Sequence, residues 1–162
     1  MNWRRGLKAL FIFAALVAMQ YTVRPLLGWR VNMDFLVIAV LLVAVRVRPA
    51  VATVVGFLTG LVADSLTPTA LGAGALAMSA IGFLASYLKA VFFADNVVLH
   101  AFFFFVGKWA FDILSLVASR RLTAPELVTE LLLWSPLAAA MTAVVGVLVL
   151  LLFRSSLEPQ SV

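Results

Sequence analysis

Long apolar runs divide this chain, and the clearest of them, residues 131–153, contains no charged side chain. A run of this length matches the roughly 20 residues with which an α-helix crosses the hydrocarbon core of a bilayer. Over the whole chain of 162 residues, 65% are hydrophobic and 12% are charged, which is more apolar material than a soluble domain of this size can bury. The runs therefore predict an all-α, polytopic integral membrane protein without a soluble catalytic or nucleic-acid-binding domain.

We expect about six transmembrane helices, which together form a single helical domain over residues 1–162. The expected helices cover residues 7–23, 33–45, 50–63, 70–91, 97–118 and 131–153. The second is short, since about 13 residues span roughly 20 Å of a 30 Å hydrocarbon core. The second and third could instead form one re-entrant hairpin. Pro136 is expected to kink the sixth helix.

The basic residues between the runs predict the orientation in the membrane. With the N-terminus inside, the inner side collects Arg4, Arg5, Lys8, Arg46, Arg48, Lys89 and Arg154, and the outer side collects Arg24, Arg30, Arg120 and Arg121. Because basic residues are retained on the cytoplasmic side, this distribution favours both termini in the cytoplasm. The same distribution indicates that the net charge of +5 serves to bind the anionic membrane surface rather than nucleic acid.

The composition also limits the chemistry that the chain can carry. It has no cysteine and a single histidine, which excludes disulfides, thiolate metal sites and sites built from several histidines. We expect no metal, no cofactor and no catalytic residue.

Small residues recur every four positions in the third expected helix, at Ala52, Gly56 and Gly60, and the series ends at Asp64. Gly56 and Gly60 form a GxxxG motif, which allows the backbone of another helix to approach closely. The neighbouring helix could belong to the same chain or to a partner protein.

Four ionisable residues lie in or near the apolar runs: Asp34, Asp64, Lys108 and Asp112. Lys108 and Asp112 are four residues apart, which places them on one face of a helix and predicts an intramembrane ion pair. A proton or ion pathway is the alternative for this pair. Asp64 and Asp112 could also form an intramembrane aspartyl protease, but the polar motifs that surround such aspartates are missing.

The segment from Asp34 through the basic turn Arg46 to Pro49, followed by Gly56-Phe57-Leu58-Thr59-Gly60-Leu61-Val62-Ala63-Asp64, resembles the MreD family of rod shape-determining membrane proteins. The resemblance continues through Leu71-Gly72 to Tyr87. The family often has Arg-Pro-Asp before the second helix, where this chain has Asn32-Met33-Asp34 and keeps only the acid.

The resemblance implies a non-enzymatic scaffold of the cell-elongation machinery in the bacterial inner membrane. Such a protein would bind MreC, work beside MreB, RodA and a class B penicillin-binding protein, and support peptidoglycan synthesis and cell shape. In this role the protein would contact membrane lipids, and it would bind its partners through helix-packing surfaces. The residues proposed for these surfaces are Gly56, Gly60, Asp64, Asp34 and Gly72. On this hypothesis Gly60→Leu should lose assembly and leave membrane insertion intact.

The substrate-binding subunit of an energy-coupling-factor transporter is the alternative function. MreD resembles these subunits in size and helix count, so the resemblance also implies their architecture. Ala14 and Ala18 have the A-x-x-x-A spacing that these subunits use for coupling. A ligand pocket would need polar groups, and the loops at residues 24–33 and 119–130 are short.

Overall fold

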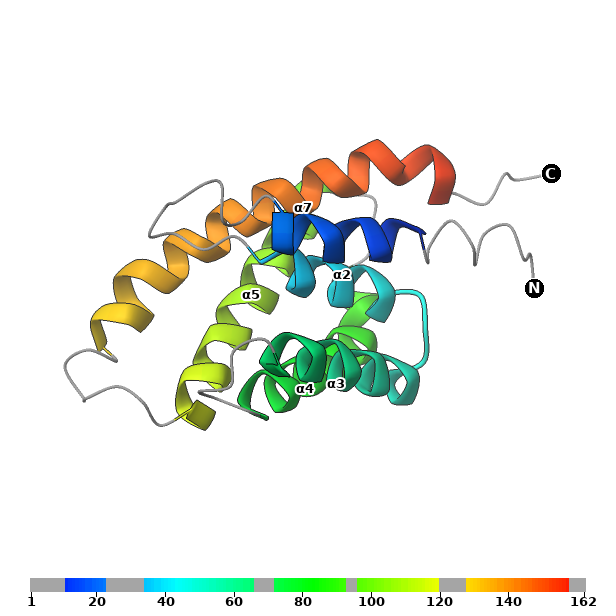
Figure 1. Ribbon diagram of the computed structural model, residues 1–162. Helices are drawn as coiled ribbons and strands as arrows, with labels where there is room; N and C mark the ends of the chain where they lie inside the picture. Colours follow the sequence, from blue (N-terminus) through cyan, green and yellow to red (C-terminus); the bar gives the residue numbers. More distant parts are fainter. Residues whose placement is uncertain (1–10, 23–33, 66–71, 93–95, 120–127, 158–162) are drawn as a thin grey trace.

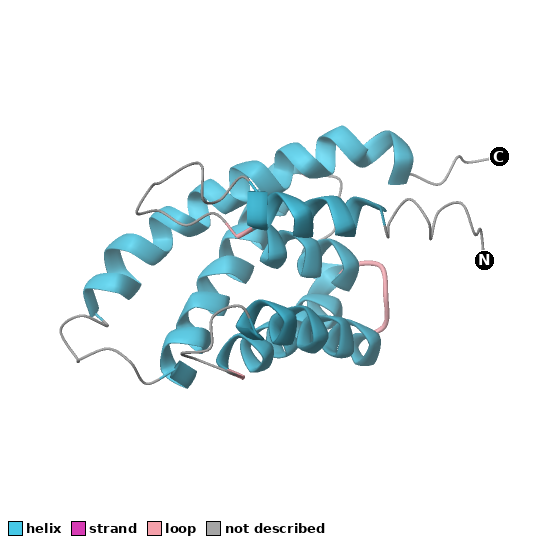
Figure 2. Ribbon diagram, viewed as in Figure 1, coloured by secondary structure: helices cyan, strands magenta, loops and turns pink. Residues whose placement is uncertain are grey.

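A computed structural model describes residues 11–22, 34–65, 72–92, 96–119 and 128–157 of the chain (Figure 1). These residues form six α-helices and no strand (Figure 2). The helices are Phe11–Thr22, α2 Phe35–Ala44, α3 Pro49–Ser65, α4 Ala73–Phe92, α5 Val97–Ser119 and α7 Ser135–Leu157, with a π-helical turn, η2 Glu130–Trp134, before α7.

Two helical segments are long and apolar enough to cross a membrane. They are Val97–Ala118, with a mean hydropathy of 1.7, and Glu130–Leu152, with a mean hydropathy of 2.3. Four shorter apolar helices accompany them: Phe11–Thr22, Phe35–Ala44, Pro49–Ser65 and Ala73–Lys89. The fold is thus the all-α membrane protein that the apolar runs predict.

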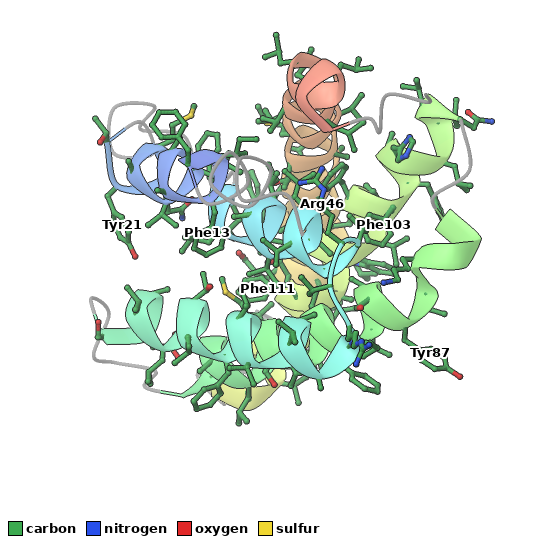
Figure 3. All side chains as sticks on the ribbon, turned by 90° about the vertical axis from the view of Figure 1, so that its right-hand side faces the viewer. Phe13, Tyr21, Arg46, Tyr87, Phe103 and Phe111 are labelled. Carbon is green, nitrogen blue, oxygen red and sulfur yellow. The ribbon has the colours of Figure 1, made fainter. Side chains whose placement is uncertain are left out.

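The short helix α2 lies at the centre of the bundle. Every residue of α2 except Val43 is buried, which explains why its sequence is apolar on all sides. It packs against α3, α4, α5 and α7, and Figure 3 shows it enclosed by these helices and Phe11–Thr22. Its 10 residues span about 15 Å, only half of a hydrocarbon core. The structure therefore makes the second helix even shorter than the expected range 33–45.

The outer surface of the bundle is apolar. On α3 the side chains of Val54, Leu58 and Val62 are each more than half exposed, and they lie four residues apart on one face. Large apolar side chains on α7 are exposed in the same spacing: Val144, Leu148 and Leu152. Such faces are expected where helices meet lipid or a partner helix rather than water.

The starts of α3 and α5 follow the expected ranges closely, whereas α4 begins at Ala73 rather than at residue 70 and α7 ends at Leu157 rather than at residue 153. Helix α3 begins at Pro49 and α5 at Val97, each within one residue of its expected start. The first expected helix extends beyond Phe11–Thr22, but residues 7–10 and residue 23 lie outside the described part of the chain. Near Pro136, where a kink is expected, the helix changes from the π-helical turn η2 to α7.

Candidate functional site

A buried cluster of charged residues joins α2 and α5 in the interior of the bundle. Lys108 Nζ lies 2.6 Å from Asp34 Oδ2 and also forms an ion pair with Asp112 Oδ1, four residues later on α5. The Lys108 side chain is only 3% exposed and its ammonium also lies 5.2 Å from the centre of the Phe111 ring. The spacing-based pair of Lys108 and Asp112 is therefore present, with Asp34 as a third member.

Asp34 stands at the start of α2 and ties this start to two other helices. Gln20 Nε2 donates to Asp34 Oδ1 at 3.1 Å, and the Phe35 amide donates to Gln20 Oε1 at 2.9 Å. The Asp34 amide donates to Thr142 Oγ1 of α7 at 3.4 Å. A helix that begins inside the bundle needs such acceptors, because its first amides have no partner within the helix.

The depth of this helix start follows from its partners. Lys108 lies about halfway along α5, and Thr142 lies well inside α7. The N-terminus of α2 is thus level with the middle of both long helices. The negative charge of Asp34 also suits the partial positive charge at a helix N-terminus.

The other end of the cluster lies on α7, where Ser135 Oγ donates to Asp112 Oδ2 at 2.6 Å. Ser135 follows the π-helical turn η2 and precedes Pro136, which has no backbone amide for a regular helical hydrogen bond. π-Helical turns are often found at functional positions. Trp109 Nε1 donates to the Leu131 carbonyl of this turn at 3.4 Å.

Within this cluster all four carboxylate oxygens of Asp34 and Asp112 accept a hydrogen bond. Gln20 and Lys108 donate to the carboxylate of Asp34, and Lys108 and Ser135 donate to that of Asp112. With Thr142 the cluster connects Phe11–Thr22, α2, α5 and α7. Paired charges of this kind fix the relative positions of the helices that carry them.

A second site of close packing lies between α3 and α4. A side-chain Cβ at Gly60 would lie 2.5 Å from Ala75 Cα, and one at Gly56 would overlap the carbonyl group of Met78. At Gly82 of α4, a Cβ would lie 2.5 Å from the Ala52 carbonyl oxygen. The small-residue series of α3 therefore faces α4 of the same chain.

Asp64 ends this series and caps α4. Its Oδ2 accepts the amide of Gly72 at 2.9 Å and the amide of Ala75 at 3.0 Å, which are otherwise unsatisfied at the start of a helix. Gly72 has φ +94°, a conformation that glycine adopts most readily, and this turns its amide toward Asp64. Asp64 and Gly72 thus belong to one helix-capping arrangement.

Asp64 and Asp112, which the sequence allowed as the two aspartates of an intramembrane protease, do not form a pair in the structure. Asp64 is bonded to the start of α4, whereas Asp112 is bonded to Lys108 and Ser135, so each aspartate has its own partners. In the described part of the chain no group of three potential metal-ligating side chains is present.

Sequence reasoning missed three polar members of the charged cluster: Gln20, Ser135 and Thr142. All three lie within or beside apolar runs, where an uncharged polar side chain also requires a hydrogen-bond partner. Applying that rule beyond charged residues would have found them.

Comparison with known proteins finds one family. The family model described as rod shape-determining protein MreD matches residues 5–155. No curated protein and no solved structure matches the chain.

Proposed function

This chain belongs to the MreD family of rod shape-determining membrane proteins, and from this membership we propose that it is a non-enzymatic scaffold that binds MreC. In this role it holds together a membrane assembly that also contains MreB, RodA and a class B penicillin-binding protein. Its contribution to peptidoglycan synthesis is then to position these proteins rather than to react with a substrate. The family match over residues 5–155 is the observation that carries the proposal.

The internal pairing of the polar groups supports a scaffold. The charged side chains of the cluster bond to one another and the carboxylate of Asp64 bonds to backbone amides. What the described helices offer to their surroundings is mainly apolar surface, such as the faces of α3 and α7. A fixed bundle with apolar outer faces suits the docking of a transmembrane partner by shape.

The proposal includes a location and an orientation. The chain is placed in the bacterial inner membrane as a multi-pass protein with both termini in the cytoplasm. The excess of basic residues on one side supports this orientation.

Copurification from native membranes tests the function. The chain is tagged at its C-terminus, solubilised in a mild detergent and analysed by mass spectrometry for the proteins that accompany it. We expect MreC together with the wall synthases. Recovery of a pair of ATPases with a coupling subunit, and no MreC, would contradict the scaffold and favour the transporter subunit.

Two matched tryptophan variants then locate the MreC contact. Leu58→Trp enlarges the outer face of α3 and Leu148→Trp enlarges that of α7, and both positions are more than half exposed. Because lipid adapts to a larger side chain whereas a packed protein interface does not, only the variant at the interface should lose MreC. Retention of the wild-type melting temperature shows that each variant still folds.

A further inference from the structure

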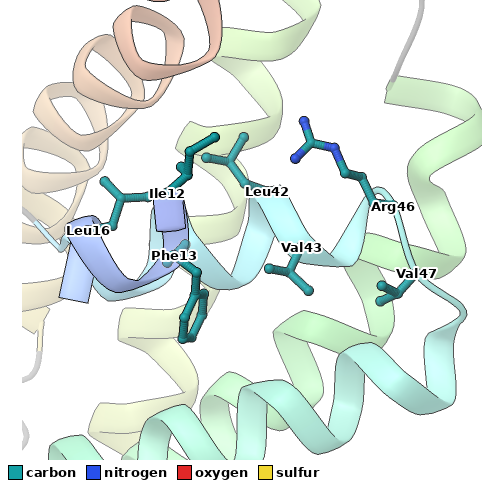
Figure 4. Close-up of a pocket in the computed structure, with 8 residues that line it drawn as sticks. Ile12, Phe13, Leu16, Leu42, Val43, Arg46 and Val47 are labelled. Atoms are coloured by element: carbon teal, nitrogen blue, oxygen red, sulfur yellow. The ribbon is translucent and has the colours of Figure 1, made fainter. Parts of the chain in front are cut away.

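An apolar groove runs between Phe11–Thr22 and α2 (Figure 4). The groove holds about 80 Å³, several times the room that one water-sized group needs. Its walls are aliphatic and aromatic along their length, and the residues that define them are Ile12, Phe13, Leu16, Leu42 and Val43. Water would gain few hydrogen bonds in such a groove, so an apolar occupant is favoured.

One end of the groove carries a positive charge. Arg46 follows the last turn of α2, and Figure 4 shows its side chain on the same side of the helix as Leu42. Among the described residues no hydrogen bond or ion pair is made by its guanidinium. Partial burial lowers the pKa of Arg46, but arginine keeps its charge throughout the physiological pH range. Within the described part of the chain, the guanidinium donors of Arg46 are therefore available to an anion.

The surroundings of Arg46 add to this positive charge. Lys89 Nζ donates to the Val47 carbonyl at 3.0 Å, which brings a second cation to the groove's end. Arg48 follows Val47 in the same loop but does not line the groove. The carboxylates of the described residues lie elsewhere: Asp34 and Asp112 pair with Lys108, Asp64 caps α4, and Glu130 begins η2.

We propose that this groove binds one anionic phospholipid, with an acyl chain between Phe11–Thr22 and α2 and its phosphate at Arg46. The two halves of such a lipid match the two parts of the site, because the groove is apolar and its end is cationic. Basic pockets between transmembrane helices bind anionic headgroups in this manner. The guanidinium adds a forked set of donors that fits phosphate oxygens. A partner helix would match the apolar walls but would need an acidic residue placed beside Arg46 as well.

Native mass spectrometry of the purified full-length chain tests the site. The protein is equilibrated with equal amounts of dioleoyl phosphatidylglycerol and dioleoyl phosphatidylcholine, and the lipid that stays bound is identified. We expect one retained lipid with a preference of about fivefold for phosphatidylglycerol, which corresponds to one basic side chain at a membrane surface. Arg46→Gln should abolish this preference.

Two further variants separate the groove from general attraction to the surface. Arg48→Gln removes the same charge from the same loop, but Arg48 does not line the groove, so the preference should remain. Val43→Phe fills the groove and keeps the charge, so the retained lipid should be lost at an unchanged melting temperature. If the phenylalanine lowers the melting temperature, the smaller substitution Val43→Leu is used in place of Val43→Phe.

Several results would overturn the proposal. Equal losses in Arg46→Gln and Arg48→Gln would indicate a diffuse charge effect without a site. Displacement of the lipid by excess inorganic phosphate would mean that the groove contributes nothing. Absence of any retained lipid in the wild-type chain would mean that the groove is not a lipid site and would favour a protein as its occupant. Because MreC is absent from these experiments, none of these results bears on the scaffold function.

Discussion

Lys108 pairs with two aspartates at the centre of the bundle, and because its side chain is only 3% exposed, neither water nor salt can take its place. Asp34 and Asp112 each place one carboxylate oxygen on its ammonium. Removing one member of a buried ion pair is costly because the remaining charge stays desolvated. The cost should therefore depend strongly on which member is removed.

Lys108→Met should destabilise the protein by about 3–5 kcal/mol, because it leaves two carboxylates without a counter-ion. Asp112→Asn should cost less, about 1–3 kcal/mol, because Lys108 keeps Asp34 while the single amide oxygen can accept from only one of Ser135 and Lys108. The melting temperature of each variant in detergent measures the difference. A loss in Asp112→Asn as large as that in Lys108→Met would contradict the central role of Lys108.

Residue spacing predicts part of this cluster and cannot predict the rest. Lys108 and Asp112 are neighbours on one helix face, so a spacing of four is sufficient to pair them. Asp34 is separated from Lys108 by 74 positions, and no local pattern indicates that α2 begins beside the middle of α5. Only the packing of whole helices brings these two residues together.

The seam between α3 and α4 depends on the absence of side chains. At Gly60 even a Cβ would lie 2.5 Å from Ala75 Cα, so any larger residue must push the helices apart. The same displacement would move Asp64 away from the amides of Gly72 and Ala75, which it caps. Packing and capping at this seam are therefore coupled.

Gly60→Leu should lower the free energy of unfolding by about 1–3 kcal/mol or more, which is the usual cost of overpacking a core. Gly60→Ala should have a smaller effect in the same direction, whereas Val54→Leu on the exposed face of α3 should have none. Melting temperatures of the three purified variants test this order. An unchanged melting temperature for Gly60→Leu, with MreC binding lost, would restore the hypothesis that Gly60 contacts a partner.

At the scale of helices, the glycine spacing predicts a close approach but does not identify the neighbour. Gly56 and Gly60 would look the same against MreC as against α4, because each requires only another backbone. The sequence does not mark the ends of α2 either, because residues 33–45 are uniformly apolar apart from Asp34. A buried helix carries no amphipathic pattern that would mark its ends.

Considered as a whole, the bundle brings several helix ends to one side. The Phe11 end of the first helix, the loop between α2 and α3 and the C-terminal end of α7 lie together at the right of Figure 1. The bond between Lys89 and Val47 places the last turns of α4 there too. The basic residues Arg46, Arg48 and Lys89, which the charge distribution predicts on the inner side, thus share one end of the molecule. The turn capped by Asp64 lies at the far end of α3, about 26 Å away along its 17 residues.

Single cysteines can test this arrangement in the membrane, because the natural chain contains none. Arg48 and Ser65 are both exposed and stand at opposite ends of α3. In intact spheroplasts a membrane-impermeant maleimide should label Ser65→Cys and should reach Arg48→Cys only after permeabilisation, because the proposed orientation places the basic end in the cytoplasm. Labelling of both cysteines from the same side would mean that α2 and α3 form a re-entrant hairpin. The opposite pattern would place the basic end outside and contradict the proposed orientation.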